Sequence, residues 1–206
     1  MRRETFVGTV LILGLLAVPL WALAVDEPYT ITLANRVVIL ALAGVGLNVA
    51  LGLGGLVSLG HAVFFGLGGY AMGILASHAQ SYTPIAEWPI LIEGSKSMPL
   101  IWLVASAVSG LAALAIGALS LRTSGVYFIM ITLAFGQMFY FFSISWPAYG
   151  GEDGLSIYVR NQFPGLNTLD PIQFFGICYV ILCLALVLVS KLSRSSFGLV
   201  LVAARQ

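Results

Sequence analysis

The most constraining feature of this chain is a stretch of 50 residues, positions 37–86, that contains no Asp, Glu, Lys or Arg. As one helix it would be about 75 Å long, whereas the hydrocarbon core of a bilayer is about 30 Å thick. The stretch must therefore turn back, and a glycine cluster at 52–60 provides the place. We expect one span over 31–51 and another over 62–77. Between them lies either a cytoplasmic turn or a helix broken inside the membrane.

The rest of the chain is equally poor in charge. Hydrophobic residues make up 60% and charged residues 8%, against about 25% charged residues in soluble domains. Further spans are expected at 6–25, 99–121, 126–146 and 171–190. These patterns predict an all-α, polytopic transmembrane helix bundle of about six spans, with a glycine-rich broken helix or turn near 52–61. We expect residues 1–206 to form a single transmembrane domain.

The first apolar run, 6–25, follows Arg2 and Arg3 and has an alternative interpretation as a signal peptide. The run is longer than the roughly 7–15 residues of a typical signal core, so we expect an uncleaved span. Either interpretation leaves the N-terminus in the cytoplasm. With six spans, the cytoplasmic side receives six of the nine basic residues, as the positive-inside rule expects. They are Arg2, Arg3, Arg122, Lys191, Arg194 and Arg205.

Several polar side chains fall inside the apolar segments and are the candidates for a translocation pathway or a helix break. Polar groups are costly in hydrocarbon, so they should face the bundle interior or water. The alternative role for each is a hydrogen bond between helices. The candidates are Asn48, Ser58, His61, Tyr70, Thr132 and Gln137.

Other patterns exclude some functions. No Asp or Glu lies within any expected span, which argues against a proton- or sodium-coupled transporter. The segment 94–97 imitates the end of a P-loop but lacks the glycine before its Lys. Cys178 and Cys183 have no zinc spacing and are expected to be small core residues. Glu152-Asp153-Gly154 is too short for a calcium loop and is expected to form a turn. We therefore expect no catalytic residue, metal, cofactor or nucleic-acid partner.

Four ordered blocks carry a family resemblance. Residues 48–70 read NVALGLGGLVSLGHAVFFGLGGY, and residues 122–136 read RTSGVYFIMITLAFG. The other two are GGEDGL at 150–155 and SSFG at 195–198, which runs on to Ala204-Arg205. Together they resemble the branched-chain amino acid ABC transporter permeases of the LivM type. Gly69 departs from the pattern, where that family often has Ala.

The resemblance implies a function and partners. It implies the permease subunit of an ATP-binding cassette importer, forming the pathway for branched-chain amino acids or related small polar solutes. Its partners would be a homologous second permease subunit, two cytoplasmic ATPase subunits, a periplasmic substrate-binding protein and membrane lipid. The location would be the bacterial inner membrane. The alternative is a gradient-driven secondary transporter or channel for small neutral solutes.

The resemblance also assigns the C-terminal end. Residues 191–206 resemble the start of the cytoplasmic coupling segment that meets the ATPase. The coupling candidates are Ser196, Phe197, Gly198 and Arg205. Members of the family are usually much longer, so we expect this sequence to be the N-terminal part of such a permease.

Overall fold

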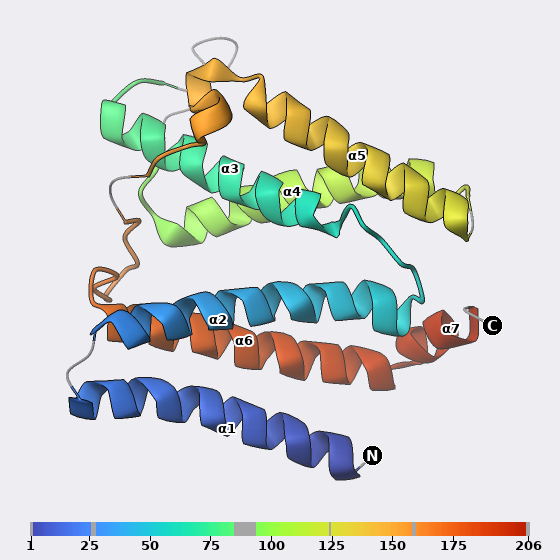
Figure 1. Ribbon diagram of the computed structural model, residues 1–206, viewed down its shortest axis with the longest axis horizontal. Coiled ribbons are helices and arrows are strands. Elements are labelled where there is room, and N and C mark those ends of the chain that lie inside the picture. The colour runs from blue at the N-terminus through green and yellow to red at the C-terminus, as the bar shows by residue number, and fades with distance from the viewer. Residues whose placement is uncertain (1, 26–27, 85–93, 124, 158–159, 205–206) are drawn as a thin grey trace. The chain divides into compact units, whose positions relative to one another are not determined.

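The computed structural model describes residues 2–25, 28–84, 94–123, 125–157 and 160–204. The described residues form helices joined by short loops, and their only β pairing consists of two isolated bridges. The expected all-α class is confirmed (Figure 1). The helices are α1 (Arg2–Val25), α2 (Pro28–Asn48), α3 (His61–Ser81), α4 (Met98–Ser120), α5 (Val126–Ile144), α6 (Pro171–Arg194) and α7 (Ser196–Ala204). A π-helical turn, η1 (Val49–Leu53), follows α2, and two 3₁₀ turns, η2 (Pro147–Tyr149) and η3 (Gly151–Asp153), follow α5.

Five helical segments of the described chain are long and apolar enough to cross a membrane. They are Tyr29–Leu53, His61–Ser81, Met98–Ser120, Val126–Ile144 and Pro171–Arg194. Helix α1, which contains Pro19, adds a shorter apolar stretch, Ile12–Ala22, among the residues whose side chains the structure describes. A crossing by α1 therefore stays a prediction. Large apolar side chains such as Leu103, Leu111 and Leu114 of α4 are exposed, as expected for a surface that faces lipid rather than water.

The chain divides into two compact units: Met1–Gly55 with Asn167–Gln206, and Leu56–Leu166. In the first unit α2 packs lengthwise on α6, and α1 packs on α2 (Figure 1). The α2–α6 interface is filled by the buried side chains of Ala34, Val38, Phe175 and Leu182. Asn35 Nδ2 adds a hydrogen bond of 3.2 Å to the Pro171 carbonyl oxygen. This pair is a closed, side-chain-packed contact.

In the second unit α3 packs on both α4 and α5. Small residues form the α3–α4 contact: Ser109 Oγ donates a hydrogen bond of 3.0 Å to the Phe64 carbonyl oxygen. A Cβ added at Gly68 would lie 3.4 Å from that same Oγ. Close approach of backbones at small residues is how helices associate in lipid, where no hydrophobic effect drives them together.

The glycine-rich break expected near 52–61 is present. The helical segment widens into a π-helical turn at Val49–Leu53, and the chain then runs irregularly from 54 to 60 before α3 begins. A Cβ at Gly52 would lie 2.8 Å from Asn48 Oδ1, so the Asn48 side chain lies directly over this turn. Gly55 has φ of +63°, a conformation that residues with a side chain rarely adopt. The boundary between the two units falls within this break.

Candidate functional sites

The start of α3 crosses α5 at a point of very close backbone approach. A Cβ added at Gly60 would collide with the Thr132 carbonyl oxygen and would lie 3.1 Å from its carbonyl carbon. On the other side of the contact, a Cβ at Gly136 would lie 3.8 Å from the Gly60 Cα atom. Only glycine at position 60 permits this distance. The crossing therefore explains why the glycine cluster continues to the first turn of α3.

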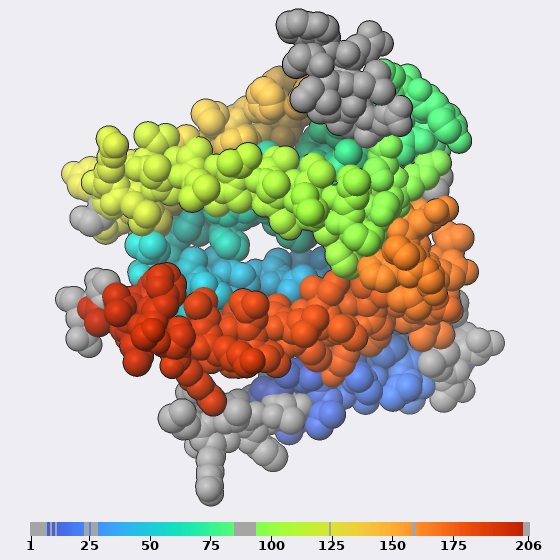
Figure 2. Space-filling model, turned by 180° about the vertical axis from the view of Figure 1, so that it is seen from behind, coloured from blue at the N-terminus to red at the C-terminus, as the bar shows by residue number. Residues whose placement is uncertain are grey.

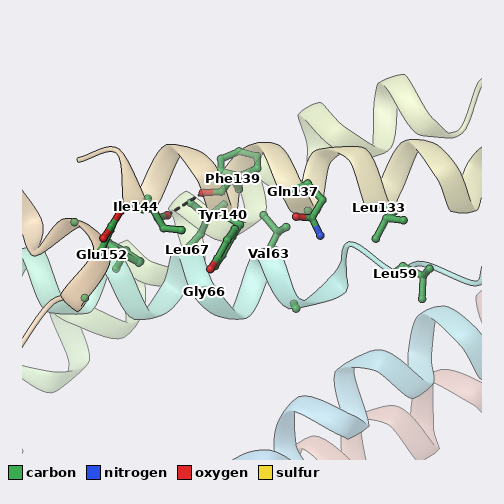
Figure 3. Close-up of a pocket in the computed structure, with 16 residues that line it drawn as sticks. Leu59, Val63, Gly66, Leu67, Leu133, Gln137, Phe139, Tyr140, Ile144 and Glu152 are labelled. Carbon is green, nitrogen blue, oxygen red and sulfur yellow. Dashed lines mark hydrogen bonds between the residues drawn. The ribbon is translucent and has the colours of Figure 1, made fainter. Parts of the chain in front are cut away.

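Beyond this crossing a groove runs between α3 and α5 as far as η3, with a volume of about 800 Å³ (Figure 3). Apolar side chains supply most of its walls. Those labelled in the figure are Leu59, Val63, Leu67, Leu133, Phe139 and Ile144. Hydrogen-bonding groups line it as well: Tyr70, Gln137, Tyr140, Ser143 and Glu152. An apolar cleft with a few convergent polar groups is the usual form of a small-molecule site.

The six pathway candidates are distributed unevenly around this groove. Tyr70 of α3 and Gln137 of α5 line it. Thr132 is buried at the crossing, and its hydroxyl donates to the Ile129 carbonyl oxygen of its own helix at 3.0 Å. Half-buried Ser58 and His61 lie just before and at the start of α3, outside the lining, and the His61 ring meets Phe64 edge-on. Asn48 lies in the other unit.

A glycine-rich double turn, formed by η2 and η3, lies at the end of the groove that is nearest the C-terminus of α5. Gly150, Gly151 and Gly154 have φ values of +91°, +51° and +76°. A Cβ at Gly150 would also collide with the Gly154 carbonyl oxygen. The turn is held by hydrogen bonds from Gly151 N to the Trp146 carbonyl oxygen at 3.2 Å and from Asp153 N to the Gly150 carbonyl oxygen at 3.1 Å. Three glycines in five residues thus allow a compact turn that places Glu152 in the groove lining.

This double turn is docked on α3 by two contacts. The Leu155 side chain lies on Gly73, where any added Cβ would collide with it. Farther along α3, His78 Nε2 is hydrogen-bonded to the Tyr149 hydroxyl at 3.1 Å. The backbone around Glu152 is therefore held between α5, which the turn follows, and α3, on which it docks. The turn expected at 152–154 is confirmed. The place of Glu152 in the groove lining was not predicted, although an acidic residue between clustered glycines was a visible signal.

The second candidate site is the elbow between α6 and α7. Ser195 Oγ accepts a hydrogen bond of 3.2 Å from Gly198 N and donates one of 2.7 Å to the Leu192 carbonyl oxygen. A Cβ at buried Gly198 would collide with that carbonyl oxygen and lie 3.0 Å from Ser193 Cα. The tight elbow therefore requires glycine. In the rear view the orange-to-red side chains of α6 and α7 form one continuous surface (Figure 2).

The remaining coupling candidates surround this elbow. Ser196 and Phe197 are exposed at the first turn of α7, whereas Arg205 lies outside the described residues. Helix α7 also contacts η1, and Leu201 Cδ2 would lie 3.7 Å from a Cβ at Gly54. The end of the chain thus packs on the first part of the glycine-rich break within the same unit.

The family model and the similar proteins that match this chain agree with each other. Residues 29–206 match the family model described as "Branched-chain amino acid transport system / permease component". The chain is similar to the high-affinity branched-chain amino acid transport system permease protein LivM of Escherichia coli K12, with 30% identity over 159 residues. It is 29% identical over 154 residues to LivM of Salmonella typhimurium LT2. The matches cover 74% and 72% of this chain but 34% and 33% of those proteins, so the chain spans about a third of their length. No solved structure gives a significant match.

Proposed function

The chain belongs to the permease-component family of branched-chain amino acid transport systems, and from that premise we propose that it acts in an ATP-binding cassette importer. In this role it forms part of the membrane pathway for branched-chain amino acids or related small polar solutes. Residues 1–206 act as one permease domain. ATP hydrolysis belongs to separate subunits.

The observation that carries this proposal is the groove beside the α3–α5 crossing. Gln137, Tyr140 and Ser143 line it at intervals of three residues along α5, so they lie on one face of the helix. Hydrogen-bonding groups within apolar walls can replace the water that a polar solute loses on leaving the aqueous phase. Irregular backbone, such as the segment before α3 that contributes Leu59 to the groove, is tolerated at membrane depth where it lines such a cavity.

The proposed partners follow from the family rather than from the groove. They are a homologous second permease subunit, two ATPase subunits and a substrate-binding protein. We place the chain in a bacterial inner membrane with the N-terminus in the cytoplasm. This orientation puts Lys191 and Arg194 at the cytoplasmic end of α6, as the positive-inside rule favours, and it puts the η2–η3 turn at the outer face.

Uptake measurements test the energy source. Membrane vesicles that contain the complete transporter should accumulate radiolabelled leucine only when ATP and the binding protein are both present. A pH or sodium gradient alone should drive no accumulation. Gradient-driven uptake without ATP would replace the importer with a secondary transporter.

The elbow provides a test of coupling. Gly198→Val should abolish uptake but leave membrane insertion intact, because the added side chain pushes α7 away from Leu192 and Ser193. Gly176→Val in α6 is the matched control, since open space surrounds that glycine. Normal uptake by the Gly198 variant would show that the elbow does not couple ATP hydrolysis to transport.

A further inference from the structure

We propose that Glu152 recognises the ammonium group of a zwitterionic solute in the α3–α5 groove, as the residue that separates amino acids from solutes lacking a positive charge. The assignment rests on the proposed function, because it takes the groove to be part of the transport pathway. It adds a specificity-determining residue to that pathway.

Charge is the first reason. Among the described residues that line the groove, Glu152 is the only one with a formal charge. The other side chains that line the groove are apolar or carry neutral hydroxyl and amide groups. Glu152 is exposed, so it presents a negative charge at the open end of a groove whose walls are otherwise neutral.

Geometry is the second reason. The glycine double turn fixes the backbone at Glu152, and the contacts of Leu155 with Gly73 and of Tyr149 with His78 tie that turn to α3. Figure 3 shows Glu152 beside Ile144 at one end of the groove, with Tyr140 and then Gln137 farther along α5. The backbone of the turn is thus held in place, and the exposed Glu152 side chain extends from it at the end of the groove.

The composition of the walls selects the class of ligand. The described residues contain no group of three or more His, Cys, Asp or Glu that could hold a metal ion, and a divalent cation would need several such oxygen ligands. An organic ammonium needs one carboxylate. The hydroxyl of Tyr140 and the amide of Gln137 offer neutral donors for a solute carboxylate. The Ser143 hydroxyl donates to the Phe139 carbonyl oxygen at 2.9 Å and can only accept from a solute. The apolar walls suit an aliphatic side chain.

The first test compares two neighbouring acids. Glu152→Gln removes the charge in the groove, whereas Asp153→Asn removes the next acid on the same turn, which does not line the groove. In vesicles with the complete transporter, uptake of radiolabelled leucine per inserted molecule should fall about tenfold or more for the first variant. It should stay within about twofold for the second. Equal uptake by both variants would overturn the assignment.

The second test measures occupancy directly. Ser143→Cys, made with Cys178→Ala and Cys183→Ala, places one thiol in the groove for labelling by a water-soluble maleimide. Leucine should slow this labelling, and 4-methylpentanoate, which is leucine without its ammonium group, should not. Adding Glu152→Gln should abolish the protection by leucine, and adding Asp153→Asn should preserve it.

Each contrary outcome has a distinct meaning. Equal protection by 4-methylpentanoate, or protection that survives Glu152→Gln, would overturn the role of Glu152. A thiol at 143 that stays unlabelled without solute would show that lipid or a neighbouring helix fills the groove, which also overturns it. Protection by leucine that needs Glu152, in vesicles without ATP-dependent uptake, would support this assignment while contradicting the proposed importer.

Discussion

Two helix pairs of this chain pack in opposite ways. Helices α2 and α6 are joined along their length by buried side chains, with Val38, Phe175 and Leu182 in the interface. Helices α3 and α5 meet closely where Gly60 lies on Thr132, and farther along they leave a groove. The first pair is closed by side chains, and the second is held by a backbone contact that leaves room beside it.

The difference shows how one apolar chain can build both a scaffold and a cavity. Large side chains fill the space between helices, whereas glycine brings backbones together and concentrates the contact at one point. Polar side chains are also distributed differently between the two helix pairs. Gln137, Tyr140 and Ser143 line the groove, while the buried cluster between α2 and α6 is apolar and is flanked by the hydrogen bond from Asn35 to Pro171. Three pairs of variants test this difference in packing.

The largest effect is expected at the α3–α5 crossing. Gly60→Ala forces a Cβ against the Thr132 carbonyl oxygen, and overpacking of this kind costs up to about 3 kcal/mol. Gly69→Ala in the same helix is the control, since open space surrounds that glycine and alanine favours a helix by about 1 kcal/mol. Unfolding in detergent by SDS titration measures both. Equal stability of the two variants would mean that Gly60 is not the point that joins α3 to α5.

The α2–α6 pair should instead lose stability when a buried side chain is shortened. Leu182→Ala removes a side chain that is 3% exposed, whereas Leu184→Ala removes one that is 64% exposed. In lipid the transfer term largely disappears and the lost packing remains, so we expect a cost of about 2 kcal/mol for Leu182. The Leu184 variant should stay within about 0.5 kcal/mol. The same SDS titration separates them, and similar values would argue against a side-chain-packed core between α2 and α6.

The smallest effect is expected at the double turn that closes the groove. Gly150→Ala and Gly165→Ala introduce comparable backbone strain, because the φ values are +91° and +81°. Only at Gly150 does the added Cβ also collide with a backbone atom; space is open at Gly165. We expect the Gly150 variant to be less stable by about 1 kcal/mol beyond the shared strain. A difference near zero would mean that the turn can relax without moving Glu152.

Much of the architecture could be predicted from the sequence because it depends on local composition. Long uncharged runs of 20 or so residues predict apolar helices in lipid, and dense glycine predicts where a helix breaks. The break before His61 follows from this composition. Tyr70 and Gln137 were identified as pathway candidates because polar groups in apolar helices must face something polar, and both line the groove.

The remaining features depend on contacts between residues far apart in the chain. Thr132 matched the same rule as Gln137, but it is buried against Gly60, and helix periodicity alone did not reveal which face would meet α3. Glu152 lies in a segment that is locally a turn. It reaches the groove because Leu155 docks on Gly73 and Tyr149 on His78, and neither contact has a local sequence signal.

Thiol accessibility tests the contrast between the two helix pairs most directly. Gln137→Cys and Val38→Cys, each in a chain without Cys178 and Cys183, place one thiol in the groove and one in the α2–α6 core, where Val38 is fully buried. In the complete transporter we predict rapid reaction of the Gln137 variant with a membrane-impermeant maleimide, and no reaction of the Val38 variant until the protein is unfolded. A groove thiol as unreactive as the core thiol would contradict the account, because it would show that α3 and α5 enclose no water-filled space.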